Sequence, residues 1–555
     1  MKGGMDSLVF DVLIEAVPHF LSGLDSATGK FLPTRVSGST LNKLSYSIYD
    51  QSPHYPLALL YKTRDSRNPY CGDIRLLAAA VKGASFLAGS QDRKGNFRLF
   101  SGGKDWGSVH LNWQVYHWQR TYELLRDELE PKVRKRWEAG LRLAVSGLKR
   151  DITDKYIKTG ILNTGFNHFL WYLLCIAKDG ELFCDRKLIS YAVRAFKKTA
   201  PSRFDGGGLW VDGEPDNWSI GYNSLSMHAM SLLHEITRDG IFENYSRKTL
   251  PLMANFSYGA ADYIETLDSR MRNGFHDAWG LNSFLSSKAY GRISYLVVEK
   301  YLARMRSGEP WLKLSINVPL IADLLGHPGG KKILRKLPFE KKSYSFREAK
   351  GRALVRKNGD WQYSLSVFCA KGLPDNVFRL EAQSHISAYN HGTGLVIGGG
   401  NSKNQPAFSN FTFSNGKDYR AKTGSLKGGK IRLNYESGSG EIEVKLSGKE
   451  LKVLTSAKGE AALTGLQLQA LWGEKVEING RSFVLGKKSL SIPLDKKVNR
   501  LILKGKAKLA VPQGSLFVWP VKPHNPYTAD NKTAPAGWVS FIYMKNSENQ
   551  VSVRI

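Results

Sequence analysis

Apolar side chains in the first 310 residues recur at a spacing of three to four positions, the repeat of an amphipathic helix. Nine segments show this spacing: 6–24, 73–90, 113–130, 133–151, 166–179, 186–200, 222–239, 249–267 and 290–305. Helices joined mostly by short connections predict a helical solenoid or a closed ring of antiparallel helical hairpins. No fixed-period repeat is visible, which argues against the named helical repeat families.

The period changes to two from about residue 340. Segments such as 430–459 and 538–555 alternate apolar and polar residues, and turn sequences such as Asn358-Gly359 separate the runs. This pattern predicts an antiparallel β-sandwich of roughly 210 residues. The change of period falls in a stretch rich in Pro and Gly between about 308 and 342. We therefore expect two domains, a helical domain at 1–320 and a β-sandwich domain at 340–555.

Composition and charge narrow the class of protein. With 42% apolar residues, the chain is a folded globular protein, and its 13 Trp, 24 Tyr and 25 Phe suit stacking on sugars. The 80 Lys and Arg outnumber the 49 Asp and Glu, which gives a net charge of +31. Such a charge attracts polyanions, and the runs 329–341 and 494–508 carry much of it. A solvated, lysine-rich surface is the plainer alternative.

Two kinds of polyanion fit this charge, nucleic acid and acidic polysaccharide. No helix-turn-helix, RNA-binding or zinc-finger signature is present. We therefore expect an acidic polysaccharide as partner and no nucleic acid, while the oligomeric state stays open.

Cysteine usage and the first residues bear on the compartment. The four cysteines show no CxxC and no metal-type spacing; Cys175 and Cys184 could pair, but buried free thiols are the simpler interpretation. The first 20 residues read as an amphipathic helix and not as a signal sequence or membrane anchor. We expect no membrane partner, and a secreted or periplasmic protein whose signal peptide lies outside this numbering; a cytoplasmic location stays open.

One stretch, 163–228, concentrates residues suited to chemistry. Asn167 and His168 stand side by side at the start of an apolar helical segment, and Tyr222 precedes another helix in a Gly-, Trp- and Asp-rich segment. An amide, an imidazole and a phenol brought together by two helix starts could remove a weakly acidic proton from a sugar carbon. The structural alternatives are a helix-capping role for the Asn-His pair and a core position for Tyr222.

These residues, in a helical half followed by a β half, resemble the polysaccharide lyases that combine an (α/α) toroid with an antiparallel β-sandwich. This group includes heparinase II/III, the toroid-type alginate lyases, and the hyaluronate, chondroitin AC and xanthan lyases. Alginate-type members have an Asn-His dipeptide followed by a catalytic Tyr, which matches Asn167, His168 and Tyr222. The hyaluronate group has a Gly-Arg-x-Ile-Ser stretch with a functional arginine, which matches Arg292 in 290–296. That group also places a catalytic His shortly before the Tyr, whereas here the nearest is His228, after it.

The resemblance implies a fold and a reaction. The fold is an α+β multidomain arrangement, an incomplete or closed (α/α) toroid followed by an antiparallel β-sandwich. The reaction is β-elimination at a uronic acid: Asn167 and His168 neutralise the carboxylate, and Tyr222 removes the C5 proton and returns one to the leaving O4. His168 is the base in one variant of this scheme. Arg292 contacts the carboxylate or lowers the pKa of the Tyr222 hydroxyl.

Substrate-binding candidates surround this set. Aromatic and polar side chains that could stack on sugars or reach hydroxyls are Trp106, Trp113, Gln114, His117, Trp210, Trp218, His385 and Tyr389. Trp113 and Trp118 do not share one helical face cleanly, so at least one of them is expected in the core. No cofactor is expected. A structural zinc or calcium ion is a lesser alternative, with His385 and His391 as zinc ligands that lack a clear Asp partner.

Two other functions stay open. The first is a glycosidase on a helical toroid, which would use paired carboxylates such as Asp205, Asp212, Glu214 and Asp216. A carboxylate-lined cleft fits poorly with a polyanion-attracting protein and would leave the Asn-His-Tyr set without a role. The second is a non-catalytic polyanion-binding protein.

Overall fold

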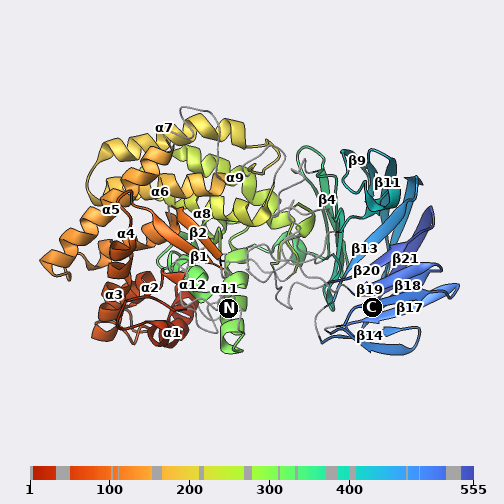
Figure 1. Ribbon diagram of the computed structural model, residues 1–555, viewed down its shortest axis with the longest axis horizontal. Coiled ribbons are helices and arrows are strands. Elements are labelled where there is room, and N and C mark those ends of the chain that lie inside the picture. Colours follow the sequence, from red (N-terminus) through yellow and green to blue (C-terminus); the bar gives the residue numbers. More distant parts are fainter. Residues whose placement is uncertain are drawn as a thin grey trace.

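The computed structural model of the protein places helices at one end of the molecule and strands at the other, as the change of period predicts (Figure 1). The residues that it describes are 4–32, 50–101, 104–109, 112–152, 165–211, 218–259, 261–267, 278–309, 313–331, 335–369, 384–398, 408–470, 473–486, 488–519 and 539–555. Within them the α-helices run from Met5 to Ala322 and the strands of the β half from Ser343 to Arg554. The predicted fold class, helical toroid followed by antiparallel sandwich, is confirmed.

The helices form two concentric sets. The inner helices, each packed against another inner helix, are α2 (His54–Lys62), α4 (Asn112–Leu125), α6 (Phe166–Leu182), α8 (Ile220–Thr237), α10 (Leu281–Ser286) and α12 (Leu314–Ala322). The outer helices are α1 (Met5–Gly23), α3 (Ile74–Ser90), α5 (Pro131–Asp151), α7 (Arg186–Arg203), α9 (Gly240–Asn255) and α11 (Arg292–Arg306). Short connections, such as the one from α6 to α7, make antiparallel hairpins of one inner and one outer helix.

The two ends of the helical half adjoin. Helix α1 packs against α11 and α12, and α12 packs against α2. The main-chain N–H of Met5 donates a hydrogen bond to the Tyr295 hydroxyl at 3.1 Å, and Arg306 forms an ion pair with Glu15 at 2.9 Å. The first helix therefore closes the ring against the last two.

The structure adds to or differs from the local expectations at three places. The predicted helix at 249–267 ends at Asn255, because Gly259 and the positive φ of Ala261 belong to a turn closed by a Ser257–Tyr263 bridge. A hairpin, β1 (Phe97–Ser101) and β2 (Lys104–Val109), stands in the helical half, where only helices and loops were expected. The Pro-rich stretch at 308–342 holds helix α12, in which Pro319 lies inside the helix.

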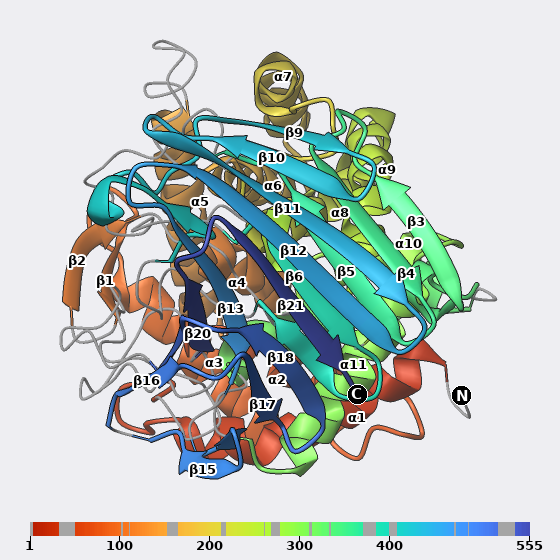
Figure 2. The same cartoon turned by 90° about the vertical axis from the view of Figure 1, so that its right-hand side faces the viewer.

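The β half consists of two antiparallel sheets. One contains β9 (Thr423–Lys427), β10 (Lys430–Asn434), β11 (Gly438–Ser447), β12 (Glu450–Gly459), β14 (Lys475–Ile478), β15 (Arg481–Val484), β17 (Val498–Leu503), β18 (Ala507–Pro512) and β21 (Glu548–Arg554). The other contains β3 (Ser343–Arg347), β4 (Ala353–Asn358), β5 (Trp361–Ser366), β6 (Ile386–Asn390), β7 (Gly394–Ile397), β13 (Leu463–Gln469), β16 (Leu490–Leu494), β19 (Ser515–Trp519) and β20 (Val539–Met544). A short strand, β8 (Phe411–Thr412), pairs with β13. Figure 2 shows the first sheet in front of the second.

The second sheet lies against the helices. Strand β5 is buried on both faces: Trp361, Tyr363 and Leu365 point into the core between the sheets, and the alternate positions face the ring. Of these, Gln362 donates to the Ser257 carbonyl oxygen at 2.8 Å, and the Ser364 hydroxyl lies 2.7 Å from the Thr266 hydroxyl. The junction next to the inner helices therefore includes a hydrogen-bonded layer.

Two global expectations can be compared with the described residues. Within these, no helix is long and apolar enough to cross a bilayer. The four cysteines are unpaired, but only Cys175 is buried, while Cys71 and Cys184 are exposed. The expectation of free thiols is confirmed and that of their general burial is wrong.

Candidate active site

The helices of the ring begin in two ways, with and without a side-chain cap. Three outer helices follow a residue whose carboxylate accepts a hydrogen bond from the N–H two positions later: Asp73, Asp185 and Asp239. Three inner helices, α6, α8 and α10, follow residues that give no side-chain cap: Gly165, Ser219 and Gly280. At a helix start without a side-chain cap, the helix dipole favours an anion.

Five inner helices also carry a buried asparagine within their first four residues: Asn112, Asn167, Asn223, Asn282 and Asn317. Each follows Leu, Phe, Tyr or Ile, so a short pair recurs at the helix starts without a fixed period. This recurrence is a sequence signal that the expectations above did not include. It brings amide groups to one end of the ring.

Asn167 is the second residue of α6, and only 2% of its surface is exposed. Its Oδ1 is buried without a hydrogen-bond partner in the described part of the chain. A buried side-chain oxygen without a hydrogen-bond partner costs about 1–3 kcal/mol of stability. Residues that carry such a cost are expected at functional sites, and the capping role that was the alternative for Asn167 is not seen.

His168 lies next to Asn167 and is half-buried. The Asn112 amide nitrogen donates to the His168 carbonyl oxygen at 3.2 Å and lies 3.5 Å from the ring Nδ1. The rings of Trp113 and His168 are 5.0 Å apart. The structure thus brings Trp113, a predicted sugar platform, beside a predicted catalytic residue.

Tyr222 is the third residue of α8, which packs alongside α6, and it too is half-buried. The indole N–H of Trp171 donates to the Leu225 carbonyl oxygen at 3.1 Å and fixes the two helices against each other. His168 and Tyr222 each lie three residues before this contact. Because one antiparallel outer helix separates α6 from α8, the two inner helices run in the same direction. His168 and Tyr222 therefore lie at matched levels, at the N-terminal ends of neighbouring helices.

The residue after Tyr222, Asn223, anchors the main chain at Trp210. The Asn223 amide accepts from the N–H of Trp210 at 2.7 Å and donates to the Trp210 carbonyl oxygen at 3.3 Å. The Trp210 ring is buried and stacks on Phe166, the first residue of α6, at 4.4 Å. Trp210 thus holds the starts of α6 and α8 together from within an aromatic core.

Trp218 joins the two halves of the molecule. Its ring is buried, packs edge-on against Phe368 and has the Arg352 guanidinium 5.3 Å from its centre. Arg352 forms ion pairs with Asp205 and with Glu348. Asp205, one of the carboxylates of the glycosidase alternative, is thereby held in a buried ion pair. The other three, Asp212, Glu214 and Asp216, lie outside the described residues, as does the side chain of Trp106 on β2.

The predicted substrate-binding residues of helix α4 differ in how deeply they are buried. Trp113 is half-buried, whereas Gln114 and His117 are 2% exposed. The His117 ring stacks on Tyr55 at 5.7 Å, and neither ring nitrogen has a hydrogen-bond partner among the described residues. Burial lowers the pKa of His117 to about 4. Trp118 packs against Trp137 in the core, which confirms that one of Trp113 and Trp118 is a core residue.

The predicted residues of the β half lie on β6 and beside it. His385 is buried, and its Nδ1 lies 3.0 Å from the Ser366 carbonyl oxygen. Tyr389 faces the ring and stacks on Tyr258 at 4.8 Å. His391 packs edge-on against Tyr389. In the described part of the chain, no group of three or more His, Cys, Asp and Glu side chains is placed to hold a metal ion.

Arg292 is the first residue of the outer helix α11. Its Nε donates to Glu340 Oε1 at 2.6 Å. None of its contacts within the described residues reaches Asn167, His168 or Tyr222. Its predicted role at the carboxylate stays a prediction.

Asp323 was missed by the sequence-based reasoning. It lies just after α12, its carboxylate is fully buried, and it accepts a hydrogen bond from the Tyr55 hydroxyl at 3.0 Å. The ring Nε2 of His228, which stacks on Trp171, is 3.3 Å from the Asp323 carboxylate, and Arg120 lies 3.4 Å away. Burial opposes the ionisation of Asp323, but the His228 hydrogen bond and the Arg120 charge outweigh it and lower its pKa. Asp323 and its partners therefore form a charged, hydrogen-bonded cluster inside the ring.

Comparison with known proteins adds evidence on the fold. No protein-family model and no curated protein matches the sequence. The structure is similar to that of a chondroitin AC lyase of Streptomyces coelicolor A3 in complex with chondroitin sulphate, with a TM-score of 0.55 and 12% identity over 99% of this chain and 79% of that one. Another chondroitinase AC lyase, from a study of oligosaccharide complexes, has a TM-score of 0.51 and 12% identity over 99% of this chain and 82% of that one.

A weaker likeness involves part of the chain. An α-1,6-mannanase of Salegentibacter sp. has a TM-score of 0.36 and 14% identity over 58% of this chain and 99% of that one. This likeness is too weak to support an argument. At 12% identity, the two lyase structures establish the fold and leave the chemistry to the residues of this chain. The chain therefore has the fold of the chondroitin AC lyases, an (α/α) toroid followed by an antiparallel β-sandwich.

Proposed function

We propose that this protein is a polysaccharide lyase that cleaves a uronic-acid-containing polymer by β-elimination and leaves a 4,5-unsaturated uronate at the new end. The observation that carries the proposal is the buried Asn167, whose Oδ1 has no partner among the described residues, beside His168 at the uncapped start of α6. Tyr222 stands at the matched level of the neighbouring helix. The fold, shared with chondroitin AC lyases, supports the same reaction class by analogy.

The carboxylate of the sugar is the first requirement. The C5 proton of a uronate becomes acidic enough to remove only when the negative charge that develops on the C6 carboxylate is stabilised. The Asn167 amide, the His168 imidazole and the first-turn N–H groups of α6 are the donors available for this carboxylate. Arg292 stays a candidate for an added positive charge, which it would share with Glu340.

The proton transfer falls to Tyr222. Its phenolate takes the proton from C5, the electrons of the C–H bond form the C4–C5 double bond, and the C4–O4 bond breaks. The resulting phenol returns the proton to O4, so the leaving sugar departs as a neutral alcohol and the phenolate is restored. His168 is the alternative base in this scheme.

The substrate would be captured by charge. The outer helices α5 and α7 carry exposed basic residues along their lengths: Lys132, Arg134, Lys135, Arg136, Arg142, Lys149, Arg150, Arg186, Lys187, Arg194, Lys197 and Lys198. Only two acidic residues lie within these helices, Glu138 and Asp151. A surface of this sign concentrates an acidic polymer near the ring. Such polymers lie outside cells, so a secreted or periplasmic location belongs to the proposal.

The test is incubation with a panel of acidic polysaccharides, with ultraviolet absorbance of the conjugated unsaturated uronate as the readout. A lyase gives this absorbance together with new chain ends. New reducing ends without absorbance would show a hydrolase, and neither would show a binding protein. The Tyr222→Phe variant serves as the matched control, because the same fold without the hydroxyl should give no absorbance.

A further inference from the structure

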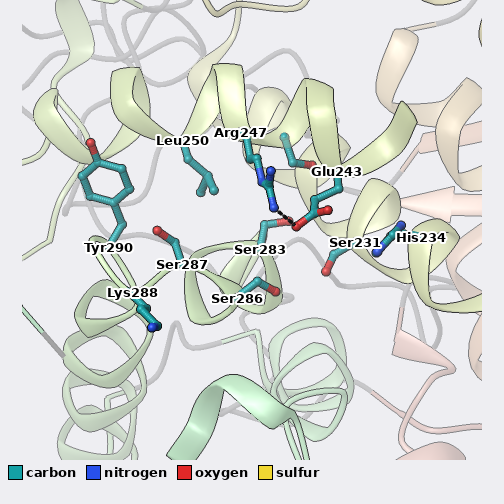
Figure 3. Close-up of a pocket in the computed structure, with 11 residues that line it drawn as sticks. Ser231, His234, Glu243, Arg247, Leu250, Ser283, Ser286, Ser287, Lys288 and Tyr290 are labelled. Atoms are coloured by element: carbon teal, nitrogen blue, oxygen red, sulfur yellow. Dashed lines mark hydrogen bonds and ion pairs between the residues drawn. The ribbon is translucent and has the colours of Figure 1, made fainter. Parts of the chain in front are cut away.

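A cavity of about 320 Å³ lies between α8, α9 and α10, outside the candidate active site (Figure 3). This volume lies at the lower end of the roughly 300–1,000 Å³ found for small-molecule sites. Serine hydroxyls dominate its lining: Ser231, Ser246, Ser283, Ser286 and Ser287. A serine hydroxyl both donates and accepts hydrogen bonds, as a sugar hydroxyl does.

One of these hydroxyls, that of Ser246, has no hydrogen-bond partner among the described residues. The Ser246 side chain is buried. Ser283 donates to the Met227 carbonyl oxygen at 2.7 Å, which leaves its own oxygen able to accept. A buried hydroxyl without a partner is costly unless a ligand or water completes it. Ser246 therefore indicates that the cavity is built to be occupied by a polar molecule.

The remaining lining residues add charge and an apolar face. Arg247 donates one hydrogen bond to Glu243 at 2.7 Å, and a guanidinium has about five N–H donors, so the others remain for a ligand. Lys288 is exposed, and no ion pair of its ammonium group occurs among the described residues. Figure 3 shows Tyr290 and Leu250 near one end of the cavity and Arg247 directed at Glu243. Hydroxyls, a net positive charge and a hydrophobic edge together fit an acidic pyranose.

The cavity lies far along α8 from the candidate active site. Ser231 and His234 follow Tyr222 by nine and twelve residues, which is about 14 and 18 Å along the helix at ~1.5 Å per residue. A sugar bound there cannot be the sugar that Tyr222 acts on. We infer that this cavity is a second saccharide site, which binds one acidic sugar unit of the polymer class that the protein degrades; the choice of an acidic sugar rests on the proposed function.

The test measures the binding of D-glucuronate to the whole protein by saturation-transfer NMR. Glucose and inorganic sulfate are the comparison ligands. Glucuronate is a single sugar without a glycosidic bond, so it binds without being cleaved. We expect a Kd on the order of 1 mM, as befits one sugar unit, and weaker binding of both comparison ligands. Sulfate that binds as well as glucuronate would reduce the cavity to an anion site and overturn the inference. Glucose that binds as well as glucuronate would overturn the inference that the bound sugar is acidic.

Two variants locate the binding. Ser246→Leu fills the cavity and Lys288→Gln removes a charge at its rim, and each should weaken glucuronate binding about tenfold. The matched changes in the β half, Ser540→Leu on β20 and Lys508→Gln on β18, alter a buried serine that also lacks a described partner and an exposed lysine. The β half contributes no residue to the cavity lining, so both changes should leave the Kd unchanged. Lys288 is exposed, so we expect Lys288→Gln to fold. This variant therefore still tests the inference if Ser246→Leu does not fold. Unchanged binding in Lys288→Gln and in any folded Ser246→Leu would overturn the inference.

The two proposals fail separately. Glucuronate binding needs no turnover, so Tyr222→Phe should retain it fully. A protein that binds glucuronate in the cavity but gives no unsaturated product would contradict the proposed lyase function alone. The unmodified protein could give the product while the cavity variants bind glucuronate as tightly as it does. This outcome would contradict the second site alone.

Discussion

Some inner and outer helices of the ring begin in opposite ways. Outer helices α3, α7 and α9 follow an aspartate whose carboxylate accepts a hydrogen bond from an N–H of the first turn. Inner helices α6, α8 and α10 start without such a cap and bury asparagines at the same end. A cap stabilises a helix, whereas an open, polar helix start does not. We therefore expect the capped outer helices to contribute to stability, while our proposal places the chemistry on the inner helices.

The strongest test of this comparison is Tyr222→Phe, on an inner helix. Loss of the hydroxyl that we propose as the proton carrier should lower kcat by about 10²–10⁴-fold. The free energy of unfolding and the affinity for polymer should stay nearly constant, because only one oxygen leaves a half-buried ring. Absorbance kinetics and denaturant unfolding measure the two quantities. A variant that keeps most of its activity on a uronate polymer would end the lyase assignment.

Asn167→Leu separates function from stability at a second inner position. Removal of one donor to a developing oxyanion should lower kcat by about 10²-fold. The same change removes a buried amide whose Oδ1 has no described partner, so the free energy of unfolding should hold or rise by about 1 kcal/mol. A large loss of stability would show that the amide is a structural element of α6, contrary to the comparison.

His117 makes the inner ring sensitive to acid. Burial lowers the pKa of its imidazole from 6.5 to about 4, so between these pH values the unfolded chain binds a proton that the folded chain does not. Stability is full above pH 6.5 and falls as the pH drops towards 4. His117→Gln should reduce this slope by up to about 1.4 kcal/mol per pH unit. Denaturant unfolding at a series of pH values provides the measurement, and an unchanged slope would exclude His117 as the cause.

Asp185→Ala tests the outer ring. Loss of the cap of α7 should lower the free energy of unfolding by about 1 kcal/mol. The same change should leave kcat on a uronate polymer unaltered, since α7 contributes no residue to the proposed proton transfer. A fall in kcat at temperatures where the variant is folded would show that the two rings are not separable in this way.

The smallest expected effect concerns substrate capture. Lys187, Arg194 and Lys198 share one face of α7, whereas Lys430, Lys445 and Lys452 on the sandwich form ion pairs with glutamates. Triple substitution by Gln on α7 should raise KM for polymer a few-fold at low salt, and the sandwich triple should change it less. The difference should vanish at high salt, because screening limits the field to about 8 Å at physiological ionic strength. Equal effects of both triples would assign capture to net charge alone.

The sequence predicts the fold better than the site. A change of hydrophobic period marks the two halves, because each regular element repeats its own pattern. The helix expected at 249–267 was wrong since the backbone of Ala261, at φ 57°, is a property of the folded turn. Asp323 was missed because it follows a Pro-containing stretch, and its partners Tyr55, Arg120 and His228 come from three distant helices. The unpartnered state of Asn167 is likewise visible only after packing.

Closure of the ring sets an order of events during synthesis. The hydrogen bond from Met5 to Tyr295 joins residues 290 positions apart, and ribosomes add about 5–20 residues per second. Helix α1, with an apolar face that includes Val9, Phe10 and Leu13, therefore waits on the order of tens of seconds for its partners to emerge. During that interval a nascent chain exposes the surface that chaperones recognise. The production of this protein is consequently more sensitive to translation speed and chaperone supply than a chain whose first helix pairs with its second.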